Sequence, residues 1–208
     1  DDDGLFNGPS GDLVTPGKYK LSLSKFVDGE MTELAGPVEF VVKPLYKDIS
    51  AEERKELIKI RDDFAELNRV ARGIIKETHQ TKERINKIRK ALYLTPDATS
   101  AMFESARAID QKLTDILLEL EPDETLAKRN APVPQSLRSR MNYIYYGIYS
   151  NTGTPTQTMK EQYSIVENDI DIIKTTLAQI VEVETKNLEK QAEEVKAPHT
   201  PGRIPVRK

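Results

Sequence analysis

The sequence predicts a mainly α protein, an elongated antiparallel bundle of three to four helices that follows a short N-terminal β-hairpin or partial sheet. Apolar residues recur at alternating steps of three and four over several long stretches, which is the pattern of helices with one covered side. Charged residues make up 31% of the 208 residues and aromatic residues only 6%, which favours a bundle with wide solvated faces over a thick globular core.

The first part of the chain has the patterns of strands. Residues 18–24 alternate apolar side chains with Lys and Ser, as a strand with one buried face does. An Asp-Gly pair at residues 28–29 predicts a hairpin turn. Residues 31–34 and 38–42 predict a return run and a further strand, with a Gly-Pro pair at 36–37 as a kink or bulge. A β-sandwich needs about seven strands, so these two or three are expected to end an incomplete sheet or to pack on the helices as an appendage.

The longest predicted helix runs from Ser50 to about Leu92. Ser50 and Glu53 have the spacing of a capping box, in which each side chain accepts a hydrogen bond from the other residue's backbone N–H. At about 1.5 Å per residue this helix is roughly 60 Å long, and it needs partners along its length. Its stripe of covered positions, in which the two threonines are the least apolar, comprises Leu57, Ile60, Phe64, Leu67, Ala71, Ile74, Thr78, Thr81, Ile85, Ile88 and Leu92.

Three further helices are predicted. The second begins at the Thr-Pro pair of residues 95–96, with the threonine as N-cap, and runs to a proline-containing loop at 121–134. The third covers about 135–149. The last begins at a second Thr-Pro pair, 154–155, and beyond Ile180 its stripe drifts, so its final turns are expected to be more weakly covered or to twist away. The covered positions are Met102, Ala106, Ile109, Leu113, Ile116 and Leu120; Leu137, Met141, Ile144, Tyr145 and Ile148; and Met159, Tyr163, Val166, Ile170, Ile173, Leu177 and Ile180.

Helix lengths predict the arrangement of the bundle. The first and last helices have about 40 residues each, and the two middle helices together approach that length. This predicts three antiparallel layers with a middle layer interrupted at 121–134, and a four-helix up-down arrangement is the alternative. The expected domains are end strands of a partial sandwich at 1–45, whose residues 1–9 are irregular, a helical bundle at 50–197 and a flexible tail at 198–208.

The composition excludes several classes of function. A net charge of −3 gives no electrostatic basis for nucleic-acid binding, and no run of about 18 apolar residues predicts a membrane span. The sequence has no cysteine, which excludes disulfides and thiolate metal sites. His79 and His199 each lack a second ligand at metal spacing. We therefore predict no catalytic residues, no metal site and no cofactor.

Tyrosines are concentrated in the third predicted helix. Four of the eight lie between residues 143 and 149. Exposed tyrosines can stack on sugar rings or anchor a protein partner. The alternative is that one or two fill the bundle and the others fill its junction with the interrupted layer. The candidate ligand- or partner-contacting residues are Tyr143, Tyr145, Tyr146 and Tyr149.

Three segments carry a family resemblance. Residues 14–23 read V-T-P-G-K-Y-K-L-S-L and are followed by the Asp-Gly pair at 28–29 and by V-E-F-V-V-K at 38–43. This order is similar to the V-x-P-G-x-Y-x-V-x-L, D-G and F-x-V strands that precede the C-terminal helices of bacterial sortilin-like, BNR-repeat glycosidase-like proteins. Residues 134–145 resemble the P-x-x-L-x-x-R-L/M-x-x-L/I helix of the same family.

The resemblance implies a function outside catalysis. Proteins of this family place their binding or hydrolytic site in an upstream β-propeller, and this sequence contains no Asp-box repeat. The chain is then expected to be a non-catalytic structural or interaction module, with Ig-like end strands, of a secreted or periplasmic protein of glycosyl hydrolase-like type. Its expected partners are that propeller and a glycan or another protein. The alternatives are a carbohydrate-contacting part of such an enzyme and a free-standing helical adaptor that binds a partner helix.

Overall fold

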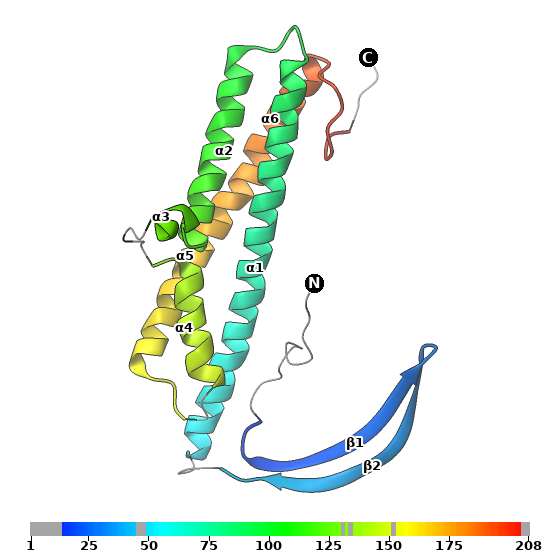
Figure 1. The fold of residues 1–208 in the computed structure, drawn as a ribbon, viewed down its shortest axis with the longest axis vertical. Helices are drawn as coiled ribbons and strands as arrows, with labels where there is room; N and C mark the ends of the chain where they lie inside the picture. Colours follow the sequence, from blue (N-terminus) through cyan, green and yellow to red (C-terminus); the bar gives the residue numbers. More distant parts are fainter. Residues whose placement is uncertain (1–13, 45–48, 130–131, 133–134, 151–152, 205–208) are drawn as a thin grey trace. The chain divides into compact units, whose positions relative to one another are not determined.

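The computed structural model describes residues 14–44, 49–129, 132, 135–150 and 153–204. Of the described residues 66% are helical, and a two-stranded antiparallel hairpin precedes the helices, which confirms the predicted mainly α class (Figure 1). It divides into two compact units, one formed by residues 1–61 with 146–155 and the other by residues 62–145 with 156–208. Helices α1 (Ala51–Tyr93) and α4 (Leu137–Tyr149) each contribute to both units. No helix in the described ranges is long and apolar enough to cross a membrane. The predicted irregular segment 1–9 lies outside these ranges.

The hairpin consists of β1 (Gly17–Val27) and β2 (Glu30–Val42). The turn is made by Asp28 and Gly29, both of which have positive φ, as a tight hairpin turn with the right twist requires. The return run and the further strand that the sequence predicts form one continuous β2. The register shifts twice within it, near the predicted Gly-Pro kink. Gly36 has φ +119°, and a Cβ there would lie 2.8 Å from the Leu21 carbonyl oxygen, so this bulge requires glycine.

Polar contacts within the first unit join the hairpin to the beginning of α1. The Tyr19 hydroxyl donates to the Thr15 carbonyl (2.6 Å), and an Arg54 Nη1–H donates to the Pro16 carbonyl (2.6 Å). The capping box also forms as predicted: Ser50 N–H donates to Glu53 (2.8 Å) and Glu53 N–H to Ser50 Oγ (3.2 Å). The predicted helix start is therefore confirmed, and α1 begins directly after the serine.

Burial along α1 follows the predicted stripe. Ten of the eleven predicted positions are buried and Ile60 is half-buried. The buried positions include both threonines, and each hydroxyl has an acceptor on its own helix. Thr78 donates to the Ile74 carbonyl (2.7 Å) and Thr81 donates to Glu77 Oε1 (3.1 Å). A threonine in a helix can thus occupy a covered position without leaving its hydroxyl unsatisfied.

The second unit is built in three layers. α1 and the last helical segment run in one direction, while α2 (Ser100–Leu120) and then α4 run in the opposite direction as two successive parts of the middle layer (Figure 1). The short α3 (Glu124–Lys128) lies in the connection between α2 and α4. The arrangement within this unit is the predicted one, in which two shorter helices share the layer beside two long ones.

Ion pairs in the second unit join neighbouring layers. Lys82 of α1 contacts Asp110 of α2 (2.7 Å). Lys112 of α2 contacts Glu184 of the last helical segment, also at 2.7 Å. These pairs are half exposed, so each contributes at most about 1 kcal/mol, and the buried apolar stripes supply most of the packing energy.

Two helices begin later than their Thr-Pro pairs predict. Thr95 instead donates its hydroxyl to the Ala91 carbonyl (2.9 Å) at the end of α1, and α2 begins after Thr99. α5 (Gln157–Gln179) is capped by Thr156, whose Oγ accepts from the Met159 N–H (3.3 Å). In both places a threonine beyond the proline takes the capping position.

The last helical segment keeps one covered side by means of a wider turn. α5 passes into a π-helix, η1 (Ile180–Thr185), and then into α6 (Lys186–Glu194). Hydrogen bonds of a π-turn span one more residue, so the stripe takes a step of five from Ile180 to Thr185 and resumes at Leu188 and Ala192, all of them buried. The expectation of weaker covering beyond Ile180 is wrong, because the extra residue restores the phase that the sequence spacing loses.

The segment predicted as a flexible tail is packed over its described part. Ala197, Thr200 and Arg203 are buried. The Arg203 guanidinium donates to the Ala197 and Pro198 carbonyls, and its Nε lies 3.0 Å from Glu193 of α6. An Arg84 Nη2–H also donates to the Gly202 carbonyl (3.4 Å). Two arginine side chains therefore hold residues 198–204, which a count of prolines and basic residues does not show.

Adjacent isoleucines of α5 provide a matched test of the stripe. Ile173 is 2% exposed and Ile172 is 58% exposed. We expect Ile173→Ala to lower the free energy of unfolding by about 2–5 kcal/mol because it leaves a cavity, and Ile172→Ala to change it by less than about 0.5 kcal/mol. Equilibrium urea denaturation measures both, and equal effects would contradict the assigned stripe.

Deletions test the role of the π-helix. Removing Val183, an exposed residue of η1, should convert the wide turn to α-helix while Leu188 and Ala192 stay covered. Removing the exposed Lys174 should rotate Leu177 and Ile180 by about 100° relative to the preceding part of α5. We expect the first deletion to change the Tm by less than about 4 °C and the second to lower it much more, as followed by circular dichroism. A larger loss on deletion of Val183 would show that the π-turn itself is required.

Candidate functional site: the hairpin face, the tyrosines of α4 and a cleft at the middle layer

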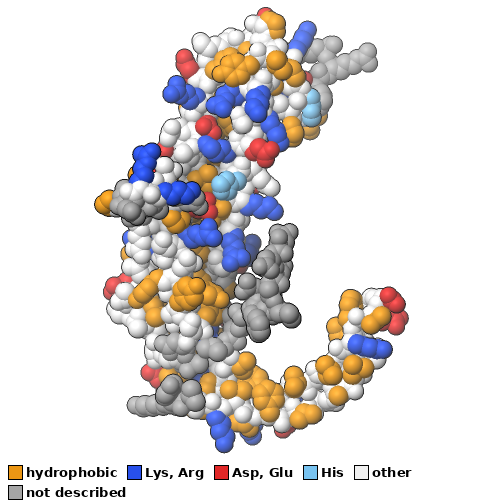
Figure 2. Space-filling view, viewed as in Figure 1, with side chains coloured by type: hydrophobic (Ala, Val, Ile, Leu, Met, Phe, Trp, Pro, Cys, Tyr) orange, Lys and Arg blue, Asp and Glu red, His pale blue; other side chains and the backbone are white. Residues whose placement is uncertain are grey.

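One face of the hairpin carries apolar side chains that nothing covers within the described part of the chain. Cross-strand pairing joins Tyr19 to Phe40, Leu21 to Val38 and Leu23 to Ala35. Residues two apart on a strand point to the same side, so these six form one surface, which we call the apolar hairpin face. Leu21 is 64% exposed and Val38 65%, and Figure 2 shows hydrophobic side chains along the hairpin. The alternation correctly predicts an apolar face on these strands, but that face is exposed and not buried.

The opposite face of the same strands is more polar. Lys20 pairs with Glu39 across the strands, with Nζ and Oε1 3.5 Å apart. Lys18 lies opposite Val41. Full burial of a large apolar side chain is worth about 1.5–3 kcal/mol, whereas an exposed ion pair is worth less than about 1 kcal/mol. A covering surface would therefore gain far more on the apolar hairpin face than on this one.

The four candidate tyrosines have different environments. In the second unit Tyr143 is 46% exposed and Tyr145 is 38% exposed. In the first unit Tyr146 is exposed, whereas Tyr149 is half-buried. The placement of Tyr145 among the covered positions of its helix is wrong, because its neighbour Ile144 occupies the covered side.

Tyr149 serves the packing of the first unit. Its hydroxyl donates to the Arg61 carbonyl (3.1 Å), and the Arg61 guanidinium lies over its ring, 5.6 Å from the centroid. Arg61 Nε donates in turn to the Ile148 carbonyl (2.8 Å). A buried arginine paired with backbone and ring in this way is a structural contact. The contacts of Tyr149 therefore explain its position without a ligand.

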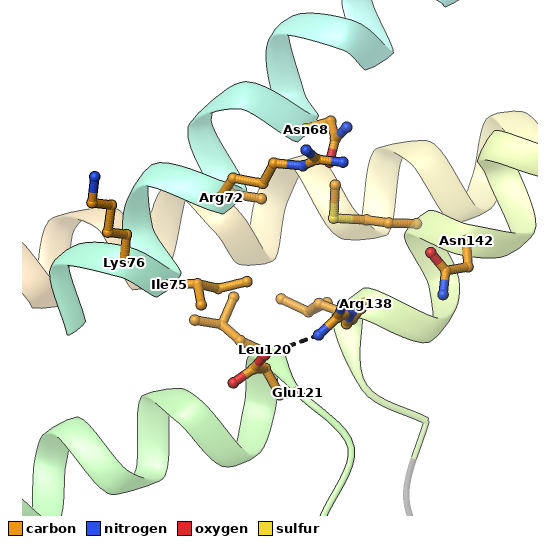
Figure 3. Close-up of a pocket in the computed structure, with 11 residues that line it drawn as sticks. Asn68, Arg72, Ile75, Lys76, Leu120, Glu121, Arg138 and Asn142 are labelled. Atoms are coloured by element: carbon orange, nitrogen blue, oxygen red, sulfur yellow. Dashed lines mark hydrogen bonds and ion pairs between the residues drawn. The ribbon is translucent and has the colours of Figure 1, made fainter. Parts of the chain in front are cut away.

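A cleft opens in the second unit at the interruption of the middle layer. Its volume is about 470 Å³, and it is lined from α1, from the end of α2 and from the beginning of α4 (Figure 3). The apolar part of the lining comprises Ala71, Ile75, Leu120, Leu137 and Met141. The polar part comprises Asn68, Arg72, Lys76, Glu121, Arg138 and Asn142. The sequence does not reveal this cleft, because its residues come from three segments with no shared motif.

The acidic and histidine side chains of the described residues make separate contacts. Glu167 accepts a hydrogen bond from the Tyr163 hydroxyl (3.2 Å). Partial burial and then the charge of Glu167 raise the pKa of Tyr163 to about 12. His79 lies 3.3 Å from Glu121, and His199 contacts the Arg203 carbonyl oxygen (3.1 Å). Among the described residues, no group of three or more His, Asp or Glu side chains could hold a metal ion.

Comparisons of the chain with protein-family models, with curated proteins and with solved structures found no match.

The contacts of Tyr149 can be tested by removing one hydroxyl. Tyr149→Phe should lower the free energy of unfolding by about 0.5–1.5 kcal/mol, because the Arg61 carbonyl loses its donor. The matched change Tyr143→Phe, at an exposed ring, should alter it by less than about 0.5 kcal/mol. Chemical denaturation of the two variants measures the difference, and an unchanged Tyr149→Phe protein would remove the structural explanation for this residue.

Proposed function

We propose that this chain is a non-catalytic structural and interaction module of a larger secreted or periplasmic protein of the sortilin-like, BNR-repeat type, and that its hairpin completes a β-sheet there. The observation that carries the proposal is the exposed apolar hairpin face. The extracytoplasmic location and the propeller partner rest on the resemblance of the strand and helix segments.

The hairpin has little to stabilise it by itself. An isolated two-stranded hairpin is marginal in water, and three or more strands or a packed face are usually needed. Tyr19 and Phe40 stack on one another with ring centroids 5.8 Å apart, yet Leu21, Leu23 and Val38 remain largely in water. Covering these three side chains would contribute on the order of 5 kcal/mol. A second layer of strands is therefore the partner that this surface favours.

A sheet suits the hairpin better than a helix does. Both outer edges of a two-stranded hairpin present backbone N–H and C=O groups that can pair with further strands. A strand at either edge would satisfy these groups, and an opposing sheet would cover the apolar hairpin face. The carbohydrate-contacting alternative has less support, since Tyr149 is engaged with Arg61 and none of the four tyrosines lines the cleft of the second unit.

Hydrogen exchange tests the proposal by comparing this chain with the full-length polypeptide that contains it in its natural source. We expect the amides of β1 and β2 to exchange rapidly in the chain alone and to be protected in the full-length protein. Unchanged exchange in the full-length protein, or a natural polypeptide with no further strands, would contradict the proposal.

Paired substitutions give a face-specific control. Leu21→Thr with Val38→Thr changes the apolar hairpin face, and Lys20→Thr with Glu39→Thr changes the opposite face at adjacent cross-strand positions. In the full-length protein we expect only the first pair to remove the protection and lower the Tm. Equal effects of both pairs would show that the hairpin is held by its edges and not by its apolar side chains.

A further inference from the structure

The α1–α2–α4 cleft exists because the middle layer is interrupted. α2 ends at Leu120 and α4 begins at Leu137, and the cleft lies beside the part of α1 between Asn68 and Lys76. Apolar side chains of α1, α2 and α4 form its floor. Such a concave site with a few polar groups at its rim is the usual form of a small-molecule pocket.

The rim of the cleft is basic although the chain as a whole is acidic. Arg72, Lys76 and Arg138 line it together with one acid, Glu121, whereas the net charge of the chain is −3. Glu121 is already paired, with Arg138 Nη1 at 3.1 Å and His79 Nε2 at 3.3 Å. Within the described part of the chain, Arg72 has no ion pair to a carboxylate. The local charge therefore favours an anion.

Amide and guanidinium donors lie around the same opening. In Figure 3 the Arg72 side chain extends along α1 toward Asn68, and Asn142 lies across the cleft near Arg138. A guanidinium offers a planar pair of N–H donors that matches a carboxylate, and an asparagine amide offers two more. The floor below is lined by Ile75, Leu137 and Met141, of which the last two are buried.

We propose that this cleft binds a small organic carboxylate with an apolar body, whose charged group meets Arg72 and Asn142 and whose body lies on Ile75 and Met141. Charge-assisted hydrogen bonds to arginine supply orientation, and the floor supplies apolar burial. A singly charged group fits better than a phosphate dianion, because Glu121 already pairs with Arg138 and leaves fewer cations to meet a second charge.

The experiment titrates the chain with 4-phenylbutyrate and follows amide chemical shifts by NMR. We expect saturable binding at millimolar concentration or below, with shifts centred on residues 68–76 and 137–142. The neutral 4-phenylbutanol tests the charge, acetate tests the apolar body and phenyl phosphate tests the class of anion. Each of these three should bind at least about tenfold more weakly.

Exposed rim residues provide variants that leave the core intact. We expect Arg72→Gln and Asn142→Asp each to weaken 4-phenylbutyrate binding by about tenfold or more. Arg107→Gln, the same change at an exposed arginine of α2 outside the cleft, should leave binding unchanged. Circular dichroism confirms that each variant is folded.

Several outcomes would overturn the proposal. They are absence of saturable binding by 4-phenylbutyrate, equal binding of 4-phenylbutanol, stronger binding of phenyl phosphate, and binding that Arg72→Gln leaves unchanged. Shifts centred on the hairpin instead of the cleft would also overturn it, because they would show that the probe binds exposed apolar surface in general.

Discussion

The covering of one side of α1 is the constraint on which the second unit depends. Its stripe continues as far as Leu92, and the other layers of this unit pack along it. The middle layer, however, is built from two helices that do not meet. Where they separate, residues of α1, of the end of α2 and of the beginning of α4 line the α1–α2–α4 cleft. The candidate binding site is therefore a consequence of the same packing rule that builds the bundle.

The same requirement explains the last helical segment and the hairpin. In the last segment the spacing of apolar residues fails at one place, and η1 takes up one residue so that Thr185 and Leu188 remain covered. The hairpin has an equally clear apolar side, but nothing within the described part of the chain lies on it. A stripe that is covered stabilises the fold, and one that is not is a candidate surface for a partner.

The candidate sites differ in how far sequence could reveal them. Alternation in residues 18–24 identified the apolar hairpin face, because side-chain direction in a strand follows from spacing alone. The tyrosine cluster was visible as composition, yet composition could not show that Tyr149 is held by Arg61 while Tyr143 is exposed. The cleft was invisible, because Arg72, Glu121 and Arg138 are brought together only when α1, α2 and α4 pack.

The sequence by itself determined the class of fold, the capping box at Ser50, the stripe of α1 and the hairpin turn, because these depend on spacing and local hydrogen bonding over a few residues. Only the tertiary structure decided that residues 180–185 widen into a π-turn, that Arg203 holds the segment after α6 and that a cleft opens beside Arg72. The π-turn and the cleft depend on contacts between residues distant in the chain or on the phase imposed by neighbouring layers. The Arg203 contacts reach residues only five to ten positions away but follow no regular spacing, so none of the three features can be read from local periodicity.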